Sequence, residues 1–314
     1  MSLLYINPGF PSLFEDGQFN YYQNTDSKYT NCKQYFIPLD YENWHRIYSN
    51  YRMISVYFRF DMYINLTNEV WNGRKDFIQV QTLGGNLYLG IDEETNLCIC
   101  CKDTVVYRKP IQMDKLTSYE LHLKSNSKEE LIELWIDNKL AYTNQGKAVV
   151  YFDGQSPTKI DCKNIIYIPN EDSLRHGIAF SDFIIGNTRL GDIVCDIVDT
   201  TIKTNWNKSA KTDYETNTDG SILTQDIDRT KLVDVQSNND VIYAIEIASD
   251  IAYADKSIDE LEFSVDDTYI NKNQLTRNTK VGTTSDIMEL HPIEKIFWDY
   301  DNIINDFNIK AGVK

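Results

Sequence analysis

Alternation of hydrophobic and polar residues is the dominant pattern in the first 190 residues of the chain. The stretch 53–64 (MISVYFRFDMYI) is rich in aromatic and β-branched residues, and 76–83 (DFIQVQTL) alternates apolar and polar side chains. A period of two is typical of a β-strand that buries one face. Gly84 and Gly85 follow the second stretch as a turn signal. These stretches therefore predict strands joined by short turns.

The same alternation predicts a series of short strands. They are expected at 86–91, 97–101, 104–107, 118–125, 131–137, 139–143, 164–168 and 178–185. Five- to eight-residue strands separated by turn residues are the pattern of a β-sandwich or jelly roll. No segment before residue 200 shows a helical period of any length. Each sheet should bury its inner face and present polar residues outward.

The pattern of apolar and polar residues changes near residue 199. A polar stretch at 205–220 is followed by apolar, alternating stretches at 240–254 and 261–266. Near the end, apolar residues recur at the spacing of one helix face: Ile296, Phe297, Tyr300, Ile303, Ile304 and Phe307. Gly312 would suit the end of such a helix. We expect a smaller β-rich domain with a short C-terminal helix.

Composition adds limits on size and partners. The 314 residues suffice for two domains, and 42% hydrophobic with 25% charged residues is ordinary globular composition. A net charge of −16 disfavours nucleic acid and anionic lipid surfaces as partners. No apolar run is long enough for membrane insertion, and the first residues lack a signal-peptide pattern. The expectation is synthesis in a bacterial cytoplasm without a signal peptide.

Three of the six cysteines, Cys98, Cys100 and Cys101, form one cluster without a nearby histidine. On a strand, Cys98 and Cys100 share a face and Cys101 points the other way. Buried thiols are favoured over the alternative, a zinc site. The four histidines are scattered along the chain and form no Ser–His–Asp set. His122, between two leucines, is expected on the outer face of a strand.

Part of the chain resembles a known fold family. The stretches 119–124 (YELHLK), 134–140 (LWIDNKL), 164–168 (NIIYI) and 179–185 (AFSDFII) resemble the late strands of the concanavalin A-like lectin/glucanase fold in its laminin-G-like form. The match covers about residues 50–190. It implies an all-β fold, with a concanavalin A-like jelly-roll sandwich followed by the smaller β-rich domain. The expected domains are an arm (1–45), a sandwich (46–199) and a C-terminal domain (200–314).

The second half carries another resemblance. The stretches 204–206, 241–247 and 292–314, ending in Gly-Val-Lys, look like the tail end of phage and prophage virion proteins. Those proteins often pair a lectin-like sandwich with such a C-terminal unit. The resemblance implies a tail or surface component of a phage-like particle, with other virion proteins, copies of itself and cell-surface glycan as partners.

The family resemblance also suggests candidate catalytic and metal-binding residues. Glucanases of this fold place paired glutamates on one strand face, with carboxylates about 5 Å apart in retaining enzymes. Glu129, Glu130 and Glu133 lack that spacing, and we expect a solvated charge cluster there. Laminin-G-like sandwiches often hold Ca²⁺, for which Asp92 and Asp153 are candidate ligands. The alternative for each is a turn-forming aspartate.

Aromatic residues crowd the first fifty positions. We expect a contact surface for a neighbouring subunit at Tyr21, Tyr22, Tyr35, Phe36, Tyr41 and Trp44. For any one of them, a core contact is the alternative.

The absence of a catalytic set in the sequence leads to a main functional prediction. It is a non-enzymatic structural component of a phage-like particle, in the tail, neck or capsid surface, that contributes to host-surface adhesion. The competing hypothesis is a carbohydrate-binding lectin or a glycoside hydrolase acting on cell-surface polysaccharide.

Overall fold

The computed structural model describes a large part of the chain. The described residues are 3–7, 21–24, 35–38, 43–50, 53–66, 72–146, 151–165, 177–193, 195, 200–204, 207–208, 214–215, 222–227, 241–252, 260–265, 268–274, 281–290, 295, 298 and 308–313. They form 23 strands and no helix, so the predicted all-β class is confirmed. Within these residues, no helix is long and apolar enough to cross a membrane.

The chain divides into two compact units, Met1–Asp196 and Ile197–Lys314. The sequence pattern predicted this boundary between residues 199 and 200.

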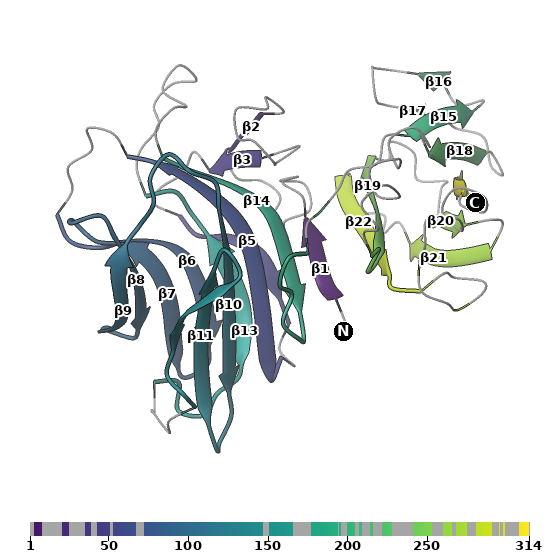
Figure 1. Cartoon of the computed structure of the whole chain (residues 1–314). Coiled ribbons are helices and arrows are strands. Elements are labelled where there is room, and N and C mark those ends of the chain that lie inside the picture. Colours follow the sequence, from purple (N-terminus) through teal and green to yellow (C-terminus); the bar gives the residue numbers. More distant parts are fainter. Residues whose placement is uncertain are drawn as a thin grey trace. The chain divides into compact units, whose positions relative to one another are not determined.

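Two antiparallel sheets make up the first unit (Figure 1). An eight-stranded sheet contains β1 (Leu3–Asn7), β2 (Tyr21–Asn24), β3 (Tyr35–Pro38), β5 (Ser55–Asn65), β10 (Thr117–Ser125), β11 (Glu130–Ile136), β12 (Lys139–Thr143) and β14 (Gly177–Gly186). A six-stranded sheet contains β4 (His45–Ser49), β6 (Lys75–Thr82), β7 (Gly85–Ile91), β8 (Asn96–Cys101), β9 (Thr104–Pro110) and β13 (Pro157–Cys162). The first sheet runs β12-β11-β10-β5-β14-β3-β2 with β1 also on β14, and the second runs β4-β13-β6-β7-β8-β9.

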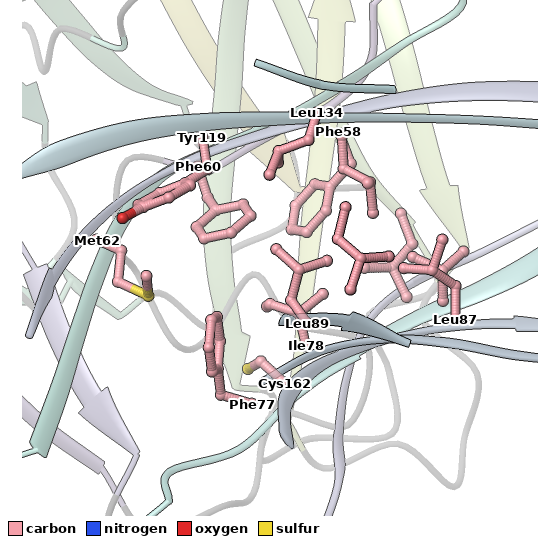
Figure 2. Packing of buried hydrophobic residues seen from close by; sticks show 14 of the residues in the cluster. Phe58, Phe60, Met62, Phe77, Ile78, Leu87, Leu89, Tyr119, Leu134 and Cys162 are labelled. Atoms are coloured by element: carbon pink, nitrogen blue, oxygen red, sulfur yellow. The ribbon is translucent and has the colours of Figure 1, made fainter. Parts of the chain in front are cut away.

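Strand β5 shows why the two sheets pack face to face. Phe58, Phe60 and Met62 are at most 1% exposed, whereas Tyr57 and Tyr63 on the alternate positions are half-buried. In Figure 2, one layer contributes Phe58, Phe60, Met62, Tyr119 and Leu134, and the facing layer contributes Phe77, Ile78, Leu87, Leu89 and Cys162. Removing these side chains from water is the main stabilising contribution to the sandwich.

Residues 1–45 were expected to form an arm, and three of their segments are strands of the eight-stranded sheet. Strand β1 pairs with β14 from Leu3 opposite Gly186 to Asn7 opposite Phe183. Strand β3 also pairs with β14, and β2 pairs with β3. These segments therefore extend the sandwich itself.

The strands that alternation predicts in the first unit are seen in the structure, with one exception. The strand predicted at 164–168 is not seen at Asn164 and Ile165, and 166–168 lie outside the described residues. The strand in this region is β13, which pairs with β4 and β6. Its sequence, PTKIDC, has a single strong apolar strand former, Ile160.

The second unit is built from strands as well. A five-stranded sheet contains β15 (Thr200–Thr204), β18 (Ile222–Ile227), β20 (Glu260–Val265), β21 (Thr268–Gln274) and β23 (Asn308–Val313). Two-stranded pairs are formed by β16 (Asn207–Lys208) with β17 (Tyr214–Glu215), and by β19 (Ile245–Ala252) with β22 (Val281–Met288).

The predicted C-terminal helix falls mostly outside the described residues. Of its span, Lys295 and Trp298 are described and neither is helical; Lys295 has a positive φ of 59°. Gly312, expected to end the helix, lies in β23, opposite Ile222 on β18 and Glu262 on β20. Residues 308–313 are therefore a strand inserted between two others.

Candidate functional site

The outer face of the six-stranded sheet carries a row of polar side chains on adjacent strands. Arg46 on β4 is paired with Asp161 on β13, Asp161 with Gln79 on β6, and Gln79 with Tyr88 on β7. Residues directly opposite each other on neighbouring strands project from the same face. We call Arg46, Gln79, Gln81, Asn86, Tyr88 and Asp161 the amide row.

The amides and the phenol of the row are joined by hydrogen bonds. The Tyr88 hydroxyl accepts from Gln79 Nε2 at 3.2 Å and from Asn86 Nδ2 at 2.9 Å. Gln81 Nε2 donates to Gln79 Oε1 at 3.3 Å. These bonds fix the planes of three amides, each of which has further donors and acceptors. The row is thus a preorganised set of polar groups.

A carboxylate and a guanidinium continue the row at its other end. Asp161 accepts a hydrogen bond from Gln81 Nε2 at 2.6 Å. It also forms an ion pair with Arg46 Nε. Asp161 is 1% exposed, whereas the Arg46 side chain is 27% exposed. A buried carboxylate requires such partners. Asp161 therefore anchors Arg46 and Gln81 on the surface above it.

Aromatic rings flank the amide row. The Trp44 ring lies 6.1 Å from the Tyr88 ring, and Lys163 Nζ lies 4.7 Å from the centre of the Trp44 ring. All of these side chains are half-buried. The face combines flat apolar rings with fixed hydrogen-bonding groups.

The aromatic residues predicted to contact another subunit are distributed over several elements. Tyr21 and Tyr22 lie on β2, and Tyr35 and Phe36 lie on β3. Tyr41 lies outside the described residues. Trp44, just before β4, belongs to the surface beside Tyr88. The intersubunit role of this set stays a prediction.

Asp92, a predicted calcium ligand, is held by its own turn. It accepts from the backbone N–H groups of Glu94 and Asn96, from the Asn96 amide and from Arg108. Burial acts to raise the pKa of Asp92, but the bonds from Asn96, Arg108 and Glu94 outweigh it and lower the pKa to about 2. This is the turn-forming aspartate that the sequence offered as the alternative.

Asp153, the other predicted ligand, is exposed and lies 3.4 Å from Lys102 Nζ. Its positive φ of 51° is a turn conformation that aspartate tolerates. Among the described residues, no three acidic, histidine or cysteine side chains are grouped as a metal site would need. Calcium binding stays a prediction without a built site in this part of the chain.

The predicted burial of the cysteine cluster is confirmed. Cys98, Cys100 and Cys101 are at most 1% exposed, and Cys101 belongs to the core between the sheets. Burial raises the pKa of Cys98 to about 11 and that of Cys100 to about 12. Such thiols stay protonated and unreactive at neutral pH.

The prediction of a solvated cluster at Glu129, Glu130 and Glu133 is wrong for two members. Glu130 is 3% exposed and accepts the backbone N–H groups of Tyr151, Phe152 and Gly154. Glu133 accepts a hydrogen bond from His122. Only Glu129, which pairs with Lys124, is a surface charge of the expected kind.

A second polar group lies on the outer face of the eight-stranded sheet. We call Arg59, Asp61, Ser118 and Asp182 the acid cluster. Arg59 Nη2 donates to Ser118 Oγ at 2.8 Å and lies 3.2 Å from Asp61 Oδ1, while Ser118 donates to Asp61. Burial raises the pKa of Asp182, and the charge of Asp61 raises it further, against the opposing charge of Arg59.

The raised pKa of Asp182 predicts that the contribution of this residue to stability falls as pH rises. A carboxyl with a folded pKa above its ordinary 3.8 stabilises the fold fully below that value, and this is lost as pH rises through the folded pKa. Asp182→Asn should therefore gain stability relative to wild type by about 1.4 kcal/mol per pH unit across that window. Urea denaturation at a series of pH values measures this.

Asp153→Asn is the matched control for this substitution. Both aspartates have a positive φ, 50° for Asp182 and 51° for Asp153, but Asp153 is largely exposed. Its variant should track wild type at every pH. A pH-independent difference between Asp182→Asn and wild type would contradict the prediction.

Comparison with known proteins gives information about the fold. No protein-family model matches the chain, and no curated protein is similar to it in sequence. Solved structures that resemble it include the alginate lyase Aly36B, at 11% identity and a TM-score of 0.33, over 47% of this chain and 75% of that one.

Two further similar structures come from different sources. The alginate lyase vAL-1 from Chlorella virus is 8% identical with a TM-score of 0.33, over 48% of this chain and 75% of that one. The catalytic domain of the glycoside hydrolase family 131 protein from Coprinopsis cinerea is 14% identical with a TM-score of 0.32, over 56% of this chain and 80% of that one. At these identities the likeness concerns the jelly-roll sandwich and not the activity.

These structures nevertheless correct the main functional prediction. They are alginate lyases and a glycoside hydrolase, and none of them is a phage structural protein. The prediction of a non-enzymatic structural component of a phage-like particle is therefore wrong, and its alternative, a protein that binds or cleaves carbohydrate, is the better hypothesis. Fixed spacings of catalytic residues along the chain are a poor guide to such a fold, because a sheet assembles its sites across strands.

Proposed function

We propose that this protein is a carbohydrate-active β-sandwich that binds glycan on the outer face of its six-stranded sheet. The amide row is the observation that carries the proposal. Sugar hydroxyls donate and accept hydrogen bonds, and the planar amides and the guanidinium, held in place by the buried Asp161 carboxylate, meet both needs. Trp and Tyr rings supply flat apolar surface for the C–H face of a sugar. The described face offers both kinds of group side by side.

The charge on this face differs from that of the whole chain. The protein carries a net charge of −16, yet Arg46, Lys159 and Lys163 lie on or beside the row. Lys159 is paired with Gln81 across β13 and β6. Local positive charge favours a polysaccharide that bears carboxylate or sulfate groups over a neutral one. Both kinds belong in a binding test.

The test uses the full chain and a panel of neutral and acidic polysaccharides in affinity gel electrophoresis, with thin-layer chromatography of the same mixtures to detect cleavage. Tyr88→Ala removes the hydroxyl that holds two amides and the ring beside Trp44. We expect it to weaken binding at least about tenfold, or about 1.4 kcal/mol.

Tyr243→Ala is the matched control, because Tyr243 is 47% exposed and belongs to the second unit. It should bind as wild type does. Wild-type protein that binds and cleaves no member of the panel, or equal affinity of Tyr88→Ala and wild type, would overturn the proposal.

A further inference from the structure

Three side chains on the outer face of the eight-stranded sheet form a continuous hydrogen-bonded chain. Ser55 Oγ lies 2.8 Å from His122 Nε2, and His122 Nδ1 lies 2.9 Å from Glu133 Oε2. A hydroxyl bonded to an imidazole, whose other nitrogen is held by a carboxylate, is the arrangement that activates a serine nucleophile. This hydrogen-bonded set of Ser55, His122 and Glu133 is separate from the amide row, which lies on the other sheet.

The register of three adjacent strands brings these residues together. His122 on β10 is directly opposite Glu133 on β11, and Ser55 on β5 is paired with Lys124, two residues beyond His122. All three therefore project from one face of the sheet. They are far apart in the sequence, which is why no Ser–His–acid set is visible along the chain.

The surroundings of His122 fix its orientation and its proton. The Tyr57 ring stacks on the imidazole at 3.9 Å with an angle of 7° between the rings. Burial lowers the pKa of His122, while the hydrogen bond and charge of Glu133 act in the opposite direction. With Nδ1–H donating to Glu133, Nε2 is the acceptor that faces the Ser55 hydroxyl. This is the form that a general base requires.

Groups that a substrate would need are close by. Ser55 and Glu133 are half-buried, so both ends of the hydrogen-bonded set reach the surface. Ile54, directly before Ser55, is 64% exposed and offers apolar contact. Lys124, the residue paired with Ser55, carries a positive charge that acts on His122. The Lys124 ammonium group is itself paired with Glu129, so both charges lie near this site.

We infer that Ser55, His122 and Glu133 form a hydrolytic site for small acyl esters. Ser55 Oγ bonds to the ester carbonyl carbon while its proton passes to His122 Nε2. The carbon–oxygen bond to the leaving alcohol then breaks, and His122 returns the proton to that oxygen. Water attacks the acyl-serine with its proton going to His122, which restores Ser55 and releases the acid. Ser55 and His122 are catalytic residues, and Glu133 is a positioning residue.

The first test is covalent labelling of the full chain with a fluorophosphonate probe, followed by peptide mass spectrometry. Ser55 should be labelled at least about tenfold faster than any other serine, and Ser55→Ala should abolish that label. Ser127→Ala is the control, since Ser127 is an exposed turn serine outside the chain of bonds. Its labelling at Ser55 should equal wild type.

The second test is hydrolysis of p-nitrophenyl acetate across pH. Ser55→Ala should lower kcat/KM at least about 100-fold, and circular dichroism checks its fold. Glu133→Gln should lower kcat and move the rising limb of the pH profile to lower pH, because Glu133 raises the pKa of His122. Lys124, Glu120 and Tyr57 also face His122 and are unchanged in this variant.

Equal hydrolysis by wild type and Ser55→Ala, or no label at Ser55, would overturn the inference. The three residues would then be only a structural set of hydrogen bonds between strands. Loss of glycan binding in Tyr88→Ala has no bearing on either result. The two sites therefore succeed or fail independently.

Discussion

Phe60→Ala is expected to lower the free energy of unfolding of the sandwich by about 4 kcal/mol, within the usual 3–5 kcal/mol for a buried phenylalanine. Phe60 is fully buried and lies at the centre of an aromatic group (Figure 2). Its ring centre is 5.1 Å from that of Phe58, 5.5 Å from Tyr119, and 6.1 Å from both Phe180 and Phe183. Truncation leaves a cavity bordered by four rings, which cannot all move inward.

Hydrogen exchange with mass spectrometry measures this effect, because peptides of β5 and β10 report the first unit separately from the second. Leu83→Ala is the control: Leu83 is 78% exposed in a hairpin and should change stability by less than about 0.5 kcal/mol. A loss below about 2 kcal/mol for Phe60→Ala would mean that the core repacks around the gap.

Glu130→Ala is expected to cost about 3–5 kcal/mol, a loss comparable to that of a core phenylalanine. The Glu130 carboxylate accepts N–H groups from Tyr151 at 2.7 Å, Phe152 at 2.9 Å and Gly154 at 3.3 Å. Hydrogen bonds to a buried charge contribute about 1.5–3 kcal/mol each, and their loss leaves buried donors unsatisfied. Phe152 is itself fully buried, so the loop cannot move out to water without exposing it.

Two further variants make this prediction specific. Glu129→Ala removes the neighbouring glutamate, a partly exposed residue paired with Lys124, and should cost less than about 1 kcal/mol. Glu130→Gln keeps one acceptor oxygen and should fall between wild type and Glu130→Ala. Urea denaturation of all three gives the order, and equal losses at positions 129 and 130 would contradict it.

The alternation of side chains predicted most strands of the sandwich because it reports a local property, the burial of one face. It missed β13, where Lys159 and Asp161 belong to a polar outer face and interrupt the apolar signal. It also misread Gly312, expected to end a helix, because pairing of β23 with β18 and β20 overrides local spacing there. Tertiary pairing decides such short segments more than their intrinsic propensity does.

The candidate sites were only partly accessible from the sequence. His122 and Glu133 are symmetric about the turn at 126–129, so a hairpin register alone would have paired them. Ser55 and the amide row depend on pairings between strands that are distant in the chain. Glu130 was misjudged for the same reason, because the three N–H groups that bind it come from residues 151–154.

The pairing of β1 with β14 has a consequence for the order in which the protein is made. Leu3 can pair with Gly186, its partner in the sheet, only after Gly186 has left the ribosome. At roughly 5–20 residues per second, this delay is about 10–40 s. Strand β5 also pairs with β14 only after a long but shorter delay, whereas β6 to β9 can pair in sequence as each emerges. During synthesis, strands β6 to β9 should therefore pair first, while β1 and β5 present open edges that a chaperone would protect.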